Sequence, residues 1–360
     1  MTLSELLHIF IKNQYICSVK KVFILFASLS LLLFACTTEF DSTADYKDIT
    51  VVYGLLDQTD SVTYLKINKA FLGEGDVMLM AKEGDSSSYG NNLEVKVEDW
   101  FNNALVKTFV FDTTTIFNKD TGLFYAPKQV LYKANTKAQL NKDHTYKLIV
   151  KNTVTGKEIR SQTVLVSPLV VTKPGSAQKF IDFTSEVPGS VEWKSSKNGK
   201  KHQLMIRFNY KEISKSGGTD TSFHSIDWLF SPLSSISING DEPMGLQYVN
   251  AYFFDLLQQQ IPIDNNLNRF IGKKGYSSVD FGAVEFIFSV ATDEFSTYLD
   301  VAAPSTSVIQ EKPDYTNITN AEGVITNDAT GIFAARFHQT RSFKLNELSS
   351  DKLKTINRGF

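Results

Sequence analysis

The sequence of 360 residues has only two cysteines, Cys17 and Cys36, and both lie near its amino terminus. Removal of a leader that ends before Cys36 would leave this residue as the sole cysteine of the mature chain. One terminal cysteine cannot form an internal disulfide bond, supply the thiolates of a zinc site or act as a nucleophile inside a folded domain. These three classes of chemistry are therefore excluded.

An excess of one charge is also missing. The 37 basic and 39 acidic residues give a net charge of −2, so the chain has no basic surplus that would attract nucleic acid. Twenty glycines and nine prolines are too few for a fibrous chain. The hydrophobic content of 42% is enough to fill a core, and the length favours two domains.

Motifs of the common hydrolase and nucleotide-binding classes are absent. There is no nucleophile elbow or phosphate-binding loop, and no two histidines are spaced as in a zinc hydrolase. Asp264, Asn266 and Asn268 match the start of a calcium-binding loop, but the glycine and glutamate required further along are absent. A looser calcium site at residues 239–242 stays open beside a solvated turn. We therefore expect no catalytic residue, metal or cofactor, and a protein that is not an enzyme.

The amino-terminal segment is typical of a signal peptide. Lys20 and Lys21 precede an apolar run over residues 22–35 that ends at Cys36. This run is too short to span a bilayer and suits the core of a signal peptide. Its end, Leu-Phe-Ala-Cys, resembles the lipobox of bacterial lipoproteins, in which the cysteine is acylated and becomes the first residue. The resemblance implies loss of residues 1–35 and a lipid anchor on Cys36; the alternative is a buried apolar element.

Residues 1–18 fit a signal peptide poorly, because the lysines normally lie close to the start. We interpret Val19 as a possible start of translation, and an unusually long leader as the alternative.

The mature chain is expected to be mainly β, with two domains behind a short polar tether at residues 36–47. Residues 48–170 contain β-branched and alternating segments, and their last hairpin is typical of an immunoglobulin-like β-sandwich. Proline and glycine near residues 168–175 place the boundary at about residue 170.

The second predicted domain, residues 171–344, is β-rich with one or two short helices. Apolar spacing predicts a helix over residues 247–260, and Thr292 is expected to cap a second one. The Asn-Gly pair at residues 198–199 predicts a hairpin turn. Residues 345–360 are expected to form a polar, charged carboxy-terminal tail that is compatible with a loose helix.

Three parts of the chain resemble a Bacteroidota outer-membrane lipoprotein family known as domain of unknown function 4249. They are the lipobox at Cys36, the Thr-Val-Val-Tyr-Gly-Leu-Leu segment at residues 50–56, and the Tyr-Thr-Asn-Ile and Gly-Ile-Phe steps at residues 315–318 and 331–333. The resemblance implies a β-rich outer-membrane lipoprotein that is often encoded beside a TonB-dependent receptor. It transfers no catalytic residue.

These features predict a non-catalytic, lipid-anchored protein that binds a ligand or a receptor as an accessory of an outer-membrane TonB-dependent transporter. A structural or adhesive surface protein is the alternative, and a hydrolase without a recognisable motif is a third hypothesis. Only two acidic residues, Glu39 and Asp41, follow the lipobox closely, so the periplasmic and surface-facing sides of the outer membrane both stay open.

Loops carry most functional contacts on a β scaffold. Residues 82–92, 214–222 and 304–330 form the longest polar loops, and the last contains Tyr315 and Asn317. We predict these two residues as a partner contact. The alternative is that Asn317 satisfies backbone groups in a turn and that Tyr315 belongs to the core.

Overall fold

The computed structural model describes residues 47–72, 79, 81–122, 125–216, 221–274, 282–303 and 314–360. The expected leader, the lipidation site Cys36 and all but the last residue of the tether lie outside these ranges. Strands account for 49% of the structure and helices for 12%, so the mainly β fold expected from the sequence is confirmed. No helix in the described ranges is long and apolar enough to cross a membrane.

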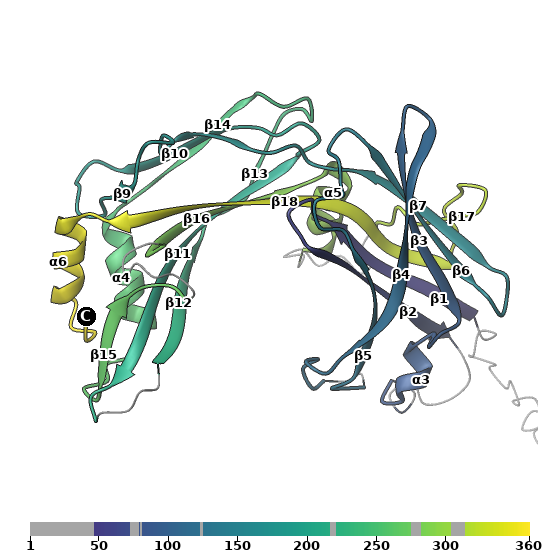
Figure 1. Ribbon diagram of the computed structural model, residues 1–360, viewed down its shortest axis with the longest axis horizontal. Helices are drawn as coiled ribbons and strands as arrows, with labels where there is room; N and C mark the ends of the chain where they lie inside the picture. Colours follow the sequence, from purple (N-terminus) through teal and green to yellow (C-terminus); the bar gives the residue numbers. More distant parts are fainter. Residues whose placement is uncertain are drawn as a thin grey trace, which may run out of the picture. The chain divides into compact units, whose positions relative to one another are not determined.

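The elements are shown in Figure 1. The first strands are β1 (Lys47–Leu56), β2 (Val62–Leu72), β3 (Leu93–Phe101), β4 (Ala104–Ile116), β5 (Gln129–Asn135), β6 (Thr145–Asn152) and β7 (Glu158–Val164). The later strands are β8 (Val170–Lys173), β9 (Phe180–Ile181), β10 (Gly189–Lys194), β11 (Lys201–Ser214), β12 (Thr221–Leu229), β13 (Leu233–Ser234), β14 (Pro243–Tyr248), β15 (Leu267–Ile271), β16 (Val284–Ala291), β17 (Thr319–Asn320) and β18 (Ala329–Leu345). The helices are α3 (Gly84–Ser87), α4 (Ala251–Gln260), α5 (Asp293–Ala302) and α6 (Glu347–Thr355).

The first seven strands form the β-sandwich. Their neighbour order is β1-β2-β5-β4-β3-β6-β7, and β4 joins the two layers because it pairs with β3 up to Phe111 and with β5 from Asp112 onward. Alternation along β3 and β6 buries one face, since every second residue of β3 from Leu93 to Val97 is apolar and buried. These faces meet Val52, Leu65 and other residues of β1 and β2 in one hydrophobic cluster.

Strand β18 is shared by the two parts of the fold. Its first half pairs in parallel with β1, from Thr50↔Ala329 to Leu56↔Ala335, and its second half pairs antiparallel with β16. A glycine is required in the first half, because Gly331 has φ +111° and a Cβ there would lie 2.0 Å from the carbonyl oxygen of Val52. Ile318 and Phe333 thus join the first hydrophobic cluster, although they follow the boundary expected near residue 170.

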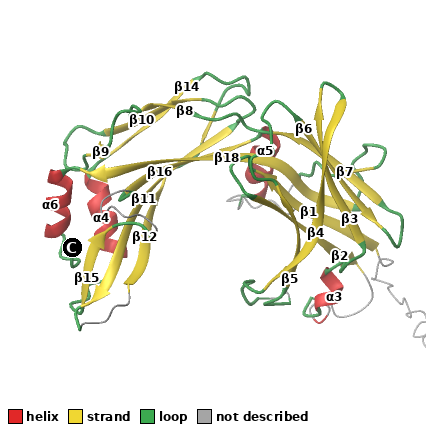
Figure 2. Cartoon of the chain, viewed as in Figure 1, coloured by secondary structure: helices red, strands yellow, loops and turns green. Residues whose placement is uncertain are grey.

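The remaining strands and helices surround a second hydrophobic cluster. Strand β11 lies between β12 and β16 in the large sheet, while β14, β10 and β8 form a separate three-stranded sheet. Helices α4 and α6, red in Figure 2, both contribute buried residues to this cluster, including Phe253, Leu257 and Leu353. The helix expected after Thr292 is present as α5 with Thr292 at the N-cap position, but the Thr292 side chain makes no capping hydrogen bond.

Two expectations for this part are wrong in detail. The helix predicted over residues 247–260 is α4, which begins at Ala251. Gln247 and Tyr248 instead extend β14, where they pair with Ser190 and Gly189. The turn at residues 198–199 forms, but it joins β10 to β11, which belong to different sheets, so the hairpin is absent.

The charged tail expected at residues 345–360 does contain a helix. Residues 347–355 form α6, whose N-cap Asn346 accepts a hydrogen bond from the Ser349 backbone N–H. Leu353 and Ile356 are buried, so two apolar residues spaced three apart hold an otherwise charged segment on the fold.

Candidate functional site

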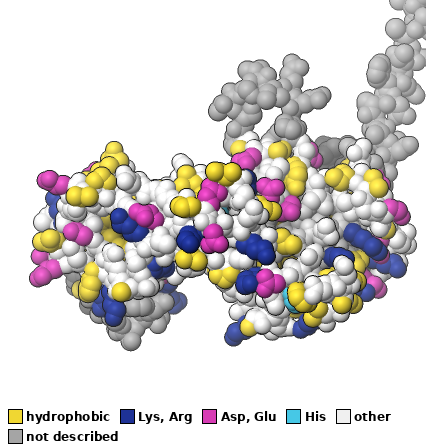
Figure 3. Space-filling model, turned by 90° about the horizontal axis from the view of Figure 1, so that it is seen from above, with side chains coloured by type: hydrophobic (Ala, Val, Ile, Leu, Met, Phe, Trp, Pro, Cys, Tyr) yellow, Lys and Arg dark blue, Asp and Glu magenta, His cyan; other side chains and the backbone are white. Residues whose placement is uncertain are grey.

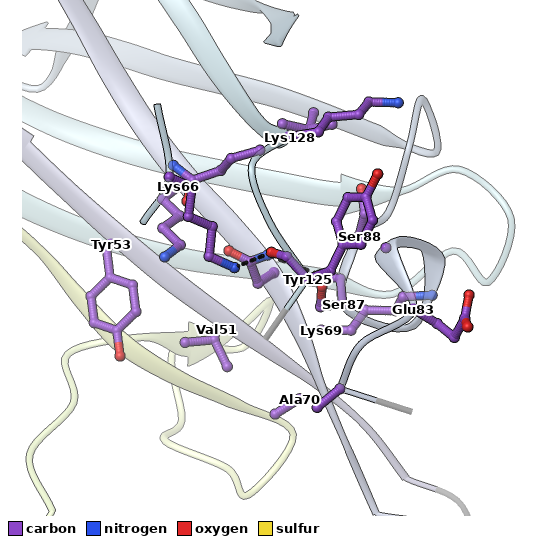
Figure 4. Close-up of a pocket in the computed structure, with 16 residues that line it drawn as sticks. Val51, Tyr53, Lys66, Lys69, Ala70, Glu83, Ser87, Ser88, Tyr125 and Lys128 are labelled. Atoms are coloured by element: carbon purple, nitrogen blue, oxygen red, sulfur yellow. Dashed lines mark hydrogen bonds between the residues drawn. The ribbon is translucent and has the colours of Figure 1, made fainter. Parts of the chain in front are cut away.

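A cavity of about 670 Å³ lies on the outer face of the β1–β2 layer. We call it the lysine groove, because Lys66, Lys69, Lys119 and Lys128 line it (Figure 4). In this view Tyr53 and Lys66 lie on one side of the cavity, and Glu83 lies on the other. Its volume is within the range of sites that bind small molecules.

The floor of the lysine groove follows from strand alternation. In β2, Leu65 and Ile67 point into the first hydrophobic cluster, so Lys66 and Asn68 point to the opposite face. In β1, Val52 is buried in the same way and Tyr53 faces outward. A wet face on an antiparallel layer is thus available for polar and aromatic side chains.

Two segments wall the floor. Residues 81–88, which include α3, are held by a hydrogen bond from Asn68 Nδ2 to the Ser87 carbonyl oxygen at 2.9 Å. Residues 125–130 are fixed to that segment because the Tyr125 N–H donates to the Ala81 carbonyl oxygen at 2.8 Å. Lys119 Nζ in turn donates to the Tyr125 carbonyl oxygen at 2.6 Å. The cavity is therefore built from four separate stretches of the chain, two in its floor and two in its walls.

The charge of the lysine groove is strongly positive. Four ammonium groups line it, and among the described lining residues Glu83 supplies the one carboxylate. Burial of Lys66, and secondarily the nearby charge of Lys119, lower the pKa of the Lys66 ammonium below its ordinary value of 10.5. The face of the molecule in Figure 3 instead shows lysine, arginine, aspartate and glutamate interspersed. The groove thus concentrates a charge that the whole chain, at net −2, does not have.

Aromatic and neutral polar groups complete the lining. Tyr53 and Tyr125 are 41% and 37% exposed, so both phenol rings are accessible from the groove. The ring of Tyr53 also meets the edge of Tyr298 on α5, with centroids 6.4 Å apart. Asn68 Oδ1 is buried and has no hydrogen-bond donor among the described residues. The arrangement can therefore offer stacking surfaces, cations and a hydrogen-bond acceptor to one bound molecule.

The predicted contact residues Tyr315 and Asn317 do not line the lysine groove. Asn317 Nδ2 donates to the Phe333 carbonyl oxygen at 2.7 Å, and its Oδ1 accepts from the Phe333 N–H at 2.9 Å. The side chain therefore satisfies the backbone N–H and the backbone carbonyl group of one residue in β18, Phe333. Tyr315 is half-buried; burial, followed by the charges of Glu294 and Asp293, raises the pKa of its phenol.

Two histidines form close pairs with buried carboxylates elsewhere. His338 Nδ1 lies 2.6 Å from Asp57 Oδ2, and His144 Nδ1 lies 2.6 Å from Asp99 Oδ1. Burial favours the neutral form of Asp57, but hydrogen bonds from His338 and Thr59 outweigh it and lower the pKa of the Asp57 carboxyl. Within the described ranges, no three His, Cys, Asp or Glu side chains are grouped so that they could hold a metal ion.

The comparisons with known proteins identify no family for the chain. No family model and no curated protein matches it. Among solved structures, the chain is similar to the C-terminal globular domain of an oligosaccharyltransferase from Pyrococcus abyssi, with 11% identity and a TM-score of 0.19. The similarity covers 62% of this chain and 44% of that one, so the chain spans less than half of that structure. A similarity of this size supports no conclusion about function.

Sequence reasoning missed the lysine groove. One signal was present, because Lys66 and Asn68 alternate with the buried Leu65 and Ile67 along an expected strand. Lys119 and Lys128 come from the segment between β4 and β5, and no sequence pattern connects that segment to β2.

Proposed function

We propose that this chain is a non-catalytic, lipid-anchored binding protein of the cell envelope and that the lysine groove is its ligand site. The observation that carries the proposal is the groove itself. It is a preformed cavity of about 670 Å³ in which the cationic and aromatic side chains converge on one space. Convergence of a few polar groups in a cavity of this size is the usual property of a small-molecule site.

The anchor in this proposal is the lipid on Cys36. It is supported by the apolar run over residues 22–35 and by the Leu-Phe-Ala-Cys step, both of which are features of the sequence. The resemblance to the Bacteroidota lipoprotein family supports an outer-membrane location. The side of that membrane on which the domain lies is not part of the proposal.

The partner in this proposal is a TonB-dependent transporter of the outer membrane. A lipid-anchored binding protein would hold a ligand close to the membrane, where a transporter could receive it. Mild detergent extraction followed by affinity capture of the chain tests this. A TonB-dependent transporter should co-purify with the wild-type chain, and an extract without any transporter would contradict this part of the proposal.

A bulky side chain placed inside the lysine groove tests whether the groove is the ligand site. Ala70 lines the cavity and is half-buried, so Ala70→Trp places an indole in the space that a ligand would occupy. We expect small molecules released from the extracted wild-type chain by denaturation to be missing from the Ala70→Trp chain. Val154→Trp is the matched control, because Val154 is exposed in the turn between β6 and β7 and lies outside the groove. Identical released molecules from all three chains would contradict the assignment.

A structural or adhesive role is the second candidate, and one observation favours it. Within the described part of the chain, β12 stands at the end of the large sheet, and Phe223 and Leu229 on it are 43% and 61% exposed. An end strand with apolar side chains can pair with a strand of another molecule. Oligomers that a Phe223→Lys substitution abolishes would favour this role over ligand binding.

A further inference from the structure

The charge and the ring surfaces of the lysine groove indicate which chemical class it binds. This question rests on the proposed function, because it concerns the same cavity. The described lining residues include four lysines and one glutamate, and neither Lys66 nor Lys128 forms an ion pair with any described residue. Two cations that have no ion-pair partner among the described residues, Lys66 and Lys128, are electrostatically unfavourable in one cavity, and a bound anion would relieve this.

The size and the uncharged lining of the lysine groove also restrict which ligands it can bind. Inorganic anions are far smaller than a cavity of about 670 Å³. Tyr53 and Tyr125 line the cavity and are partly exposed, and aromatic side chains in a lining favour a ligand that has rings of its own. Glu83 is a hydrogen-bond acceptor in the same lining, so the ligand should also carry hydroxyl groups.

We infer that the lysine groove binds an acidic oligosaccharide, with carboxylate or sulfate groups facing Lys66 and Lys128 and sugar rings against Tyr53 and Tyr125. The cavity volume fits roughly two or three sugar units. Anionic groups also occur on lipid headgroups, and the experiment separates the two sources. A headgroup presents its charge at a membrane surface, whereas these lysines line a walled cavity between residues 81–88 and 119–130.

The test is titration calorimetry of the detergent-solubilised full chain with three trisaccharides. Trigalacturonate carries a carboxylate on each ring, sulfated galactotriose carries sulfates, and galactotriose is their neutral counterpart. We expect at least one anionic trisaccharide to bind at least tenfold more tightly than galactotriose, and to weaken as sodium chloride rises from 50 to 500 mM.

Variants assign the binding to the groove. Lys66→Gln and Lys128→Gln should each weaken the anionic trisaccharide at least fivefold, without a change in Tm. Lys151→Gln is the control, because Lys151 is an exposed lysine of β6 outside the groove. It should bind as the wild type does.

Four outcomes overturn the inference. One is that neither anionic trisaccharide binds, and a second is that galactotriose binds equally well. The second leaves the groove as a ligand site, so the proposed function survives it. A third is that inorganic phosphate binds as tightly as the trisaccharides, which would show that charge alone is recognised. The fourth is that the chain binds vesicles containing phosphatidylglycerol through Lys66 and Lys128 while ignoring both anionic sugars, which would assign the groove to a lipid.

Discussion

Replacement of Asn317 by alanine tests whether this residue holds the fold or is free for a partner. Both polar groups of the Asn317 side chain are bonded to the peptide of Phe333, whose side chain is fully buried in the first hydrophobic cluster. Asn317→Ala removes two hydrogen bonds and leaves an N–H and a carbonyl group of β18 without their partners.

The expected magnitude follows from these two contacts. A net hydrogen bond contributes about 1 kcal/mol, and an unsatisfied buried polar group costs about 1–3 kcal/mol. Because Asn317 is itself half-buried, water can partly reach the unsatisfied groups, which reduces the cost of leaving them without partners. We therefore expect Asn317→Ala to lower the free energy of unfolding by about 2–4 kcal/mol.

Urea unfolding followed by far-ultraviolet circular dichroism measures this change. Asn265→Ala is the matched control, because Asn265 is an exposed asparagine in the loop before β15 and should change stability by less than about 0.5 kcal/mol. If Asn317→Ala is no less stable than Asn265→Ala, the structural role of Asn317 is refuted and the partner-contact hypothesis for this residue regains its support.

Three further predictions concern other parts of the chain. Because the folded state lowers the pKa of Asp57, its stabilising contribution is present above the ordinary value of 3.8 and is lost as the pH falls through the folded pKa. In urea unfolding, Asp57→Asn should therefore lose more stability at pH 7 than at pH 3, and an equal loss at both would contradict the Asp57–His338 pairing. Gly331→Ala places a Cβ 2.0 Å from the Val52 oxygen, so we expect a loss of more than about 2 kcal/mol or no soluble protein. Cys36→Ser should yield an unlipidated chain that keeps residues 1–35 or is soluble; a wild-type amino-terminal peptide without lipid in the mass spectrum would contradict acylation.

Elements with local signals could be predicted from the sequence. Alternation in β3 and in the β6–β7 hairpin depends on neighbouring residues, and the structure has both where the pattern indicates them. Thr292 and the acidic residues after it identify the start of α5 for the same reason.

Features that depend on distant residues could not be predicted. Tyr248 fits a helical stripe in the sequence, but it pairs with Gly189 in β14 and packs against Phe183 and Trp228, so tertiary contacts override the local pattern. The length of β18 also depends on distant residues, because its first half pairs with β1 and its second half pairs with β16. The lysine groove could not be predicted for the same reason, since it forms only when the segment around Lys119 and Lys128 lies beside β2.

Lysine acetylation tests whether the lysine groove holds a ligand in the native protein, and it requires no knowledge of that ligand. The chain is extracted from its own membrane, and one half is washed at 1 M salt to screen ionic contacts. Both halves are then treated with an acetylating reagent and analysed by mass spectrometry. The lowered pKa of Lys66 leaves more of its amine neutral and reactive once the groove is empty. We expect Lys66 and Lys128 to react slowly before the wash and faster after it, while Lys151 reacts at the same rate in both halves. If the wash leaves the acetylation rates of Lys66 and Lys128 unchanged, as it does that of Lys151, the lysine groove holds no ligand.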